Sequence, residues 1–208
     1  MNPESLTTFL AASFLLSLAP GPDNIFVLTQ SALYGKRPGI IITLGLCTGL
    51  IVHTGAVALG VAAIFMVSAR AFTTLKLIGA SYLLYLAWQA WKASASSLDN
   101  SLETTLPSIG ALYRRGIIMN LSNPKIAIFF LAFLPQFADP ASGNMTLQLF
   151  MLGCIFILVS FIVFSIIACL AGLIAEYFKR SKHAQTLLNR IAALVFTSLA
   201  LRLATISR

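Results

Sequence analysis

Apolar residues run along this chain in long stretches that short polar segments separate. About 20 consecutive apolar residues are enough for a helix to cross a bilayer. The pattern therefore predicts an all-α integral membrane protein with six transmembrane helices, over residues 6–33, 39–66, 71–91, 115–137, 146–176 and 187–205. The polar segment 177–185 is expected to form a loop between the last two helices.

A longer polar segment divides the chain into two halves of three helices each. We interpret residues 1–208 as a single transmembrane domain, with one repeat over about 1–92, a cytoplasmic linker over 93–113 and a second repeat over about 114–208. Because three is an odd number, the two halves enter the membrane from opposite sides. This predicts two inverted repeats. Six unrelated helices that share an apolar composition are the alternative.

The composition supports a membrane protein and bears on its orientation. Only 10% of the residues are charged, whereas soluble domains carry about 25%. The net charge of +8 comes from basic residues in short loops rather than from a continuous stripe, so we expect no nucleic-acid partner. Lys and Arg are most frequent in the loops after the first, third and fifth helices. This bias places those loops in the cytoplasm and both termini outside.

Two of the apolar stretches are interrupted by proline at matching places in the two halves. The interruptions are Pro20-Gly21-Pro22-Asp23 in the first helix and Asn123-Pro124-Lys125 in the fourth. Proline lacks a backbone donor and clashes with the preceding turn, so helices 1 and 4 should both be broken. Paired broken helices in two halves of a membrane protein indicate the binding site of a transporter.

Lys125 lies too deep in its helix to reach water. It is about ten residues, or ~15 Å, from either end of the span, and an unpaired charge there is costly. Asn123 is expected to cap a restarted helix whose first residue is Pro124. Lys125 and the free N–H groups of that helix would then form an anion site for a substrate. A structural ion pair between Lys125 and Asp23 is the alternative.

Asp23 follows the first proline motif, and three roles stay open for it. It could carry a coupling proton, bind a substrate ammonium group or cap the second half of its helix. The neighbouring Asn24, and Asn120 beside the second motif, are further candidates for substrate binding or coupling.

His53 falls in the middle of the second predicted helix, on the same face as Gly45 and Gly49. A face of small residues usually packs closely against another helix. We therefore favour a structural, hydrogen-bonded histidine over one that lines a substrate cavity.

Other function classes find little support in the sequence. Cys47, Cys154 and Cys169 lie in apolar stretches without CxxC or metal-binding spacing, so neither a metal site nor a thiol carrier is expected. An intramembrane enzyme would need a nucleophile with a base, or metal ligands, at depth. No cofactor is expected. A channel stays open as an alternative, because broken helices also form pores.

The two proline motifs resemble the signature of the LysE/RhtB family of bacterial amino-acid exporters. The segments Phe129-Phe130 and Phe133-Leu134-Pro135-Gln136-Phe137 and the Lys36-Arg37 loop are similar too, and the resemblance covers essentially the whole chain. It implies a secondary transporter in the bacterial inner membrane that exports amino acids by proton antiport with alternating access. It also places Pro20, Gly21, Pro22 and Pro124 at the helix breaks.

The chain departs from the family pattern in one respect that affects coupling. Many members have an acidic residue in the fifth helix, but residues 155–165 contain none. Asp23, and after it His53, would then carry more of the proton coupling. The lack of a second intramembrane acid favours small neutral substrates such as threonine, homoserine or leucine over dibasic ones; another small metabolite is the alternative. The expected partners are the amino acid, protons and the lipid bilayer, and a homodimer stays open.

Overall fold

The computed structural model describes residues 3–61, 69–92, 108–139, 143–180 and 182–205. The regular secondary structure in these ranges is helical. The elements are α1 (Pro3–Leu18), α2 (Pro22–Tyr34), α3 (Lys36–Ala56), the π-helical segment η1 (Val57–Val61), α5 (Ala69–Lys92), α6 (Ile109–Leu121), α7 (Pro124–Ile128), η2 (Phe129–Phe133), η3 (Leu134–Phe137), α8 (Met145–Arg180) and α9 (Lys182–Thr205).

Both predicted helix breaks are present. The axes of Glu4–Leu18 and Pro22–Tyr34 differ by 58°, and those of Ile109–Leu121 and Pro124–Phe137 differ by 50°. Each pair is long and apolar enough to count as one broken span.

The described residues contain further helices that can cross a membrane. They are Lys36–Gly60, Met145–Ile174 and Thr186–Thr205, which with the two bent pairs give up to five candidate spans. α5 is a 24-residue helix at the position of the third expected span, but it is not among these candidates. The helical membrane architecture is therefore confirmed, whereas six spans in inverted repeats stay a prediction.

Several predicted boundaries are wrong. No loop extends over 177–185, because α8 runs to Arg180 and α9 begins at Lys182; this polar segment is rich in good helix formers. α6 begins at Ile109 rather than at 115, because the Ser108 hydroxyl caps it by accepting a hydrogen bond from Ala111 N at 3.3 Å. Most of the predicted linker, 93–107, and the end of the second span lie outside the described residues.

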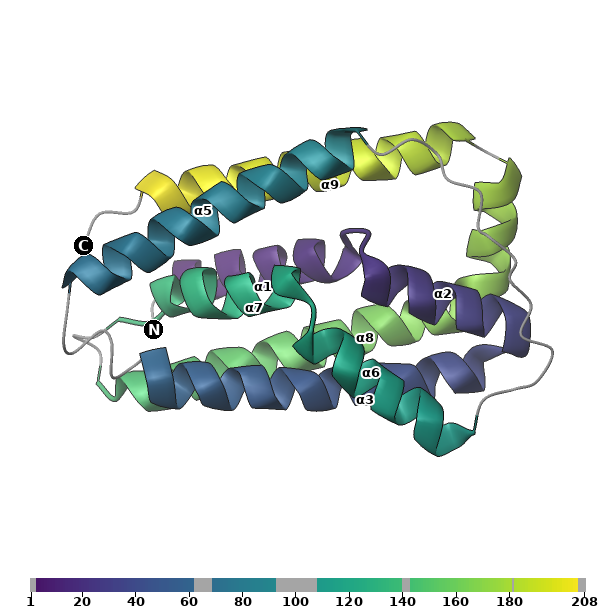
Figure 1. Ribbon diagram of the computed structural model, residues 1–208, viewed down its shortest axis with the longest axis horizontal. Coiled ribbons are helices and arrows are strands. Elements are labelled where there is room, and N and C mark those ends of the chain that lie inside the picture. Colours follow the sequence, from purple (N-terminus) through teal and green to yellow (C-terminus); the bar gives the residue numbers. More distant parts are fainter. Residues whose placement is uncertain (1–2, 62–68, 93–107, 140–142, 181, 206–208) are drawn as a thin grey trace.

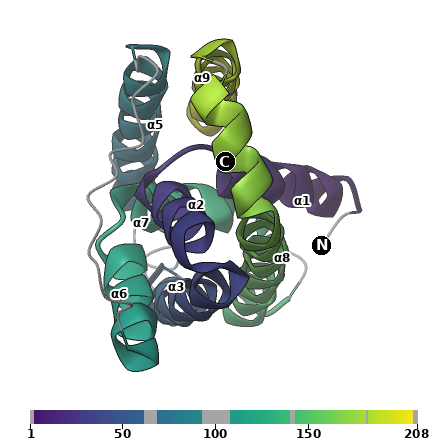
Figure 2. The same cartoon turned by 90° about the vertical axis from the view of Figure 1, so that its right-hand side faces the viewer.

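The helices are arranged in three layers (Figures 1 and 2). α5 and α9 lie side by side and form one outer layer, and α3, α6 and α8 form the opposite one. α1, α2 and α7 lie between them, so the broken helices occupy the middle of the molecule. Both breaks lie near the middle of the long axis (Figure 1).

The two ends of the molecule differ in charge. The N- and C-termini lie at one end, and the turn between α2 and α3 and the start of α6 lie at the other (Figure 1). The second end carries exposed basic side chains at the start of α3 and in the first half of α6: Lys36, Arg37, Arg114 and Arg115. This grouping agrees with the loop assignment from the sequence, but which end faces the cytoplasm stays a prediction.

Glycines bring α3 and α6 close together. A Cβ atom on Gly45 would collide with the backbone of Tyr113 and Gly116, and one on Gly49 would lie 2.6 Å from Asn120 Oδ1. Backbones approach this closely only where small residues face each other. The packing role predicted for the Gly45–Gly49 face is therefore confirmed.

A cluster of buried phenylalanines fills the half of the molecule between the breaks and the terminal end. Its members are Phe9, Phe129, Phe130, Phe133, Phe137 and Phe156. The centroid of the Phe129 ring lies 5.0 Å from the centroid of the Phe133 ring and 5.0 Å from that of the Phe156 ring. These contacts pack η2 and η3 against α1 and α8 and close that half of the interior.

Candidate functional site

The first break leaves main-chain carbonyl groups without helical partners. In a continuous helix, the N–H of residue 20 would bind the carbonyl of Leu16, and that of residue 22 would bind Leu18. Pro20 and Pro22 have no N–H, so both carbonyls are freed. Gly21 continues the chain in an extended conformation, and α2 starts at Pro22. The break thus creates acceptors in the middle of the protein.

Lys125 binds one of these freed carbonyls and a second carbonyl at the break. Its Nζ donates to Leu16 O at 3.4 Å and to Ala19 O at 3.2 Å. The side chain is only 5% exposed, and it places its charge at the negative end of the α1 dipole. Gly21 leaves space for this approach, since a Cβ atom there would lie 3.1 Å from Nζ. The end of α1 therefore contributes to compensating the cation.

Asn123 connects the two breaks. Its Oδ1 accepts a hydrogen bond from Lys125 N at 3.0 Å, and Pro124 is the first residue of α7. This confirms the predicted N-cap. Its Nδ2 donates to Asp23 Oδ2 at 2.8 Å. One side chain thus caps the second restarted helix and holds the carboxylate of the first.

Asp23 and Asn24 lie in the first turn of α2 and are both buried. The second carboxylate oxygen of Asp23, Oδ1, has no hydrogen-bond partner among the described residues. Asn24 Nδ2 donates to Ser17 O at 2.7 Å, another carbonyl at the end of α1. Asn24 Oδ1 likewise has no partner in the described part of the chain. Two acceptor atoms are therefore available beside the break.

A small cavity lies where the two breaks meet. Its walls include Asp23, Asn120 and Lys125, and its volume is about 10 Å³. That is room for about one water molecule. The structure thus brings these three predicted residues together in a closed site that does not hold an amino acid in this conformation.

His53 lies at the second break but not on this cavity. Pro124 cannot donate to the carbonyl of Asn120, which accepts a hydrogen bond from Asn123 N at 3.0 Å, and His53 Nε2 lies 3.4 Å from the same oxygen. The imidazole also packs against Phe130, with ring centroids 5.7 Å apart. These contacts agree with a structural histidine.

Two features of the site were not predicted. The hydroxyl groups of Ser17 and Ser160 are hydrogen-bonded at 3.0 Å and join the end of α1 to α8. The carbonyl partners of Lys125 were also missed, although the last four carbonyls of any helix lack helical donors. Counting the donors that the prolines remove would have indicated Leu16 O, which loses the N–H of residue 20.

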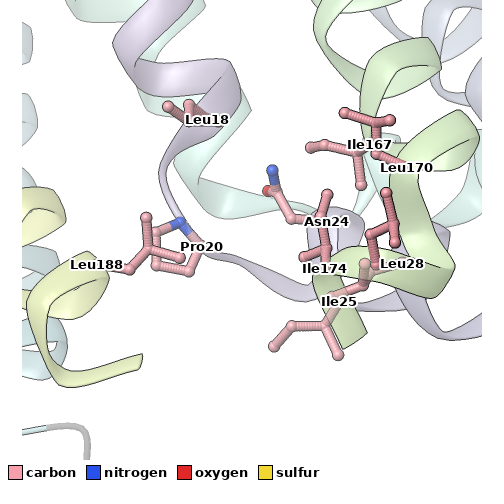
Figure 3. A pocket seen from close by; sticks show the side chains of 10 residues that line it. Leu18, Pro20, Asn24, Ile25, Leu28, Ile167, Leu170, Ile174 and Leu188 are labelled. Atoms are coloured by element: carbon pink, nitrogen blue, oxygen red, sulfur yellow. The ribbon is translucent and has the colours of Figure 1, made fainter. Parts of the chain in front are cut away.

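A much larger cavity lies on the other side of the first break (Figure 3). It measures about 450 Å³ and is bounded by the break itself, α2, α8 and the start of α9. Its walls are aliphatic apart from Asn24. Among the described residues, no group of three His, Cys, Asp or Glu side chains could hold a metal ion.

The chain matches known proteins over nearly its whole length. The family model of the LysE type translocator matches residues 14–207. The homoserine/homoserine lactone efflux protein of Salmonella typhimurium (strain LT2) is 37% identical over 187 residues, which are 90% of this chain and 90% of that protein. The protein of the same name from Salmonella typhi shows the same identity and coverage.

A further relative is an uncharacterized membrane protein of Vibrio cholerae, which is 33% identical over 197 residues, or 95% of each chain. No solved structure matches the chain. The family match and these relatives confirm the resemblance seen in the proline motifs and indicate a transporter rather than an enzyme. The chain belongs to the LysE type translocator family.

Proposed function

We propose that this protein is a secondary transporter that exports small neutral amino acids, or close derivatives of them, from the bacterial cytoplasm. The observation that carries the proposal is the meeting of two broken helices at Asp23, Asn123 and Lys125 in the middle of the molecule. Two relatives are named for the efflux of homoserine and homoserine lactone, which supports the same substrate class here.

The chemistry of those two compounds favours recognition of the ammonium group. Homoserine has both an ammonium and a carboxylate group, whereas its lactone keeps the ammonium but has no free carboxylate. In this chain the unpartnered Oδ1 of Asp23 suits an ammonium group, and Lys125 is already held by two carbonyls. We therefore assign the ammonium to Asp23 and its neighbour Asn24. Lys125 then stabilises the first break through its two carbonyl contacts, and the third N–H of its ammonium group stays available for a substrate carboxylate.

The same assignment provides a mechanism for proton antiport. A carboxylate binds either a proton or an ammonium group well, but not both together. If Asp23 is the shared site, substrate arriving from the cytoplasm displaces a proton, and a proton arriving from outside displaces the substrate. Each conformational change then carries either the substrate outward or a proton inward across the membrane. Asn120 and His53 serve this site by holding the second break.

Transport assays in proteoliposomes test the proposal. The purified protein should exchange radiolabelled homoserine, threonine or leucine with saturation kinetics, and an imposed pH gradient should accelerate net flux. Flux that rises linearly with concentration would favour the channel alternative. The absence of amino-acid flux in vesicles with correctly inserted protein would overturn the proposed function.

A further inference from the structure

The 450 Å³ cavity beside the first break has the size and lining of a small-molecule site. Binding pockets commonly measure about 300–1,000 Å³ and are mostly apolar with a few placed polar groups. This cavity is walled by aliphatic side chains that include Leu18, Ile25, Leu28, Ile167, Leu170 and Leu188. They come from four helices, α1, α2, α8 and α9, which meet around the break (Figure 3).

One buried polar side chain interrupts this apolar lining. Asn24 is 8% exposed, and Figure 3 shows its amide among the aliphatic groups of the wall. Its Nδ2 is used by Ser17 O, whereas its Oδ1 has no partner among the described residues. An unpaired buried acceptor is costly, so this oxygen is suited to a donor that a ligand brings.

The cavity adjoins the proposed ammonium site. Asp23 lines the small central cavity, and the next residue, Asn24, lines the large one. The large cavity continues from the break along α2 to Leu28 and along α8 to Ile174. From the break, α2 runs toward its turn with α3 at the end of the molecule that carries the exposed basic side chains, which is the predicted cytoplasmic end (Figure 1). A substrate loaded from that end would reach Asn24 with its side chain among the leucines and isoleucines.

We propose that this cavity binds the aliphatic side chain of the exported amino acid while Asn24 Oδ1 accepts a hydrogen bond from its α-ammonium group. This inference rests on the proposed function and narrows it to amino acids with alkyl side chains. Each methylene group that enters the cavity should tighten binding about fourfold.

A competition series in proteoliposomes measures this directly. The vesicles take up radiolabelled homoserine by exchange, and the competitors are alanine, 2-aminobutyrate, norvaline and norleucine. For the parent protein, the half-inhibitory concentration should fall about fourfold with each added methylene. A phospholipid acyl chain is the other occupant that could fill an aliphatic cavity, and in that case the competitors should not differ with chain length.

A matched pair of variants on α8 tests the location. Leu170→Trp fills the cavity, whereas Leu158→Trp adds the same bulk at an exposed position of α8 that does not line it. Leu170→Trp should flatten the dependence on chain length, and Leu158→Trp should keep it. Leu188→Trp fills the cavity from α9 and should behave like Leu170→Trp if the first variant inserts poorly.

Asn24→Ala tests the ammonium contact separately. It should weaken all four competitors by a similar factor, because the lost hydrogen bond is common to them. A parent protein without chain-length dependence, or a Leu170→Trp protein that keeps it, would overturn the cavity assignment while leaving amino-acid export intact. A parent that exchanges no amino acid would instead overturn the proposed function, and this subsite with it.

Discussion

At the scale of single residues, the buried charge of Lys125 is explained by missing hydrogen-bond donors. Pro20 cannot bind Leu16 O, and Lys125 Nζ takes its place and also binds Ala19 O. The lysine therefore joins the second half of the protein to the broken end of α1. It holds together the two elements that must separate if the site is to open.

Replacing Lys125 by alanine should abolish export. The change leaves the two carbonyls without their donor and Asp23 without its nearby cation, and removing one partner of a buried charged contact costs about 3–5 kcal/mol. Lys125→Arg keeps the charge in a different geometry and should retain part of the activity. Export of radiolabelled homoserine and membrane abundance should be measured together, since misfolding would imitate lost function. A well-inserted Lys125→Ala protein with the parental export rate would contradict the assigned role.

Asp23→Asn should separate substrate exchange from proton coupling. Asparagine keeps an acceptor for Asn123 Nδ2, so the link between the breaks survives, but it carries no exchangeable proton. The variant should still exchange labelled for unlabelled substrate, more slowly because the ammonium loses its charged partner. It should also lose the acceleration by a pH gradient.

The control for this variant is the parent protein at the same density in the same vesicles. Gradient-driven export by Asp23→Asn at the parental rate would place coupling on another group. His53, the next titratable side chain at the breaks, would then be tested in the same way.

The sequence predicted which residues belong to the site, but it predicted few of the contacts between them. The cap by Asn123 and the helix start at Pro124 follow from local rules and are confirmed. The partner of Lys125 could not be read from the sequence in the same way, because it depends on how two distant breaks meet. The bond between Ser17 and Ser160 has the same cause, since hydroxyl groups 143 residues apart leave no local signal.

At the scale of elements, the crossing of α3 and α6 positions the second break. Gly116 faces Gly45 so closely that a Cβ atom on either residue would meet the backbone of the other helix. Asn120, one turn further along α6, packs against Gly49 and reaches the central cavity. The glycines therefore set the depth at which α6 ends and α7 restarts.

Two Gly→Ala changes in α6 should differ in their effect on stability. Gly116→Ala should lower thermal stability and export, because its Cβ meets the α3 backbone, which cannot shift cheaply. Gly110→Ala meets nothing within 4 Å and should leave stability equal or raise it by about 0.5–1 kcal/mol, as expected for a helical position. Unfolding temperatures in one detergent would compare them. Equal unfolding temperatures for the two variants would show that α3 and α6 can move apart at their crossing without loss of stability.

Hydropathy predicted which segments are helical but not where each one ends. The apolar stretches and the prolines located the broken helices, because both signals are local and strong. The expected loop over 177–185 is absent, since hydropathy detects the edge of the bilayer and α8 continues beyond its apolar segment to Arg180. α5 is helical and pairs with α9 in an outer layer, as the third predicted helix, although it is not among the candidate spans.

At the scale of the whole molecule, the two sides of the breaks are filled differently. Packed phenylalanines occupy the side toward the termini, and the large aliphatic cavity lies on the side toward the basic end. Asp23 and Lys125 are each the second residue of a restarted helix, which fits the inverted repeat that we infer. In an alternating-access cycle, the aromatic side would open while the cavity closes. This conformation would then be closed outward and ready to load from the basic end.

That direction of transport depends on which end faces the cytoplasm, and cysteine labelling should show that the basic end does. The exposed Lys36 begins α3 at that end, and positive loops are retained in the cytoplasm. After Cys47, Cys154 and Cys169 are replaced by alanine, single cysteines can be introduced as Lys36→Cys at the basic end and Thr7→Cys near the N-terminus.

A membrane-impermeant maleimide applied to intact spheroplasts should label Thr7→Cys and leave Lys36→Cys unlabelled until the membrane is disrupted. Both side chains are exposed on the surface of the protein, so burial in its interior does not explain a difference in labelling. Lys92→Cys, at the end of α5, should behave like Lys36→Cys, because the charge bias of the loops places both in the cytoplasm. Labelling of Lys36→Cys in intact spheroplasts would reverse the orientation. The cavity beside Asn24 would then face the periplasm, where a substrate leaves an exporter rather than enters it.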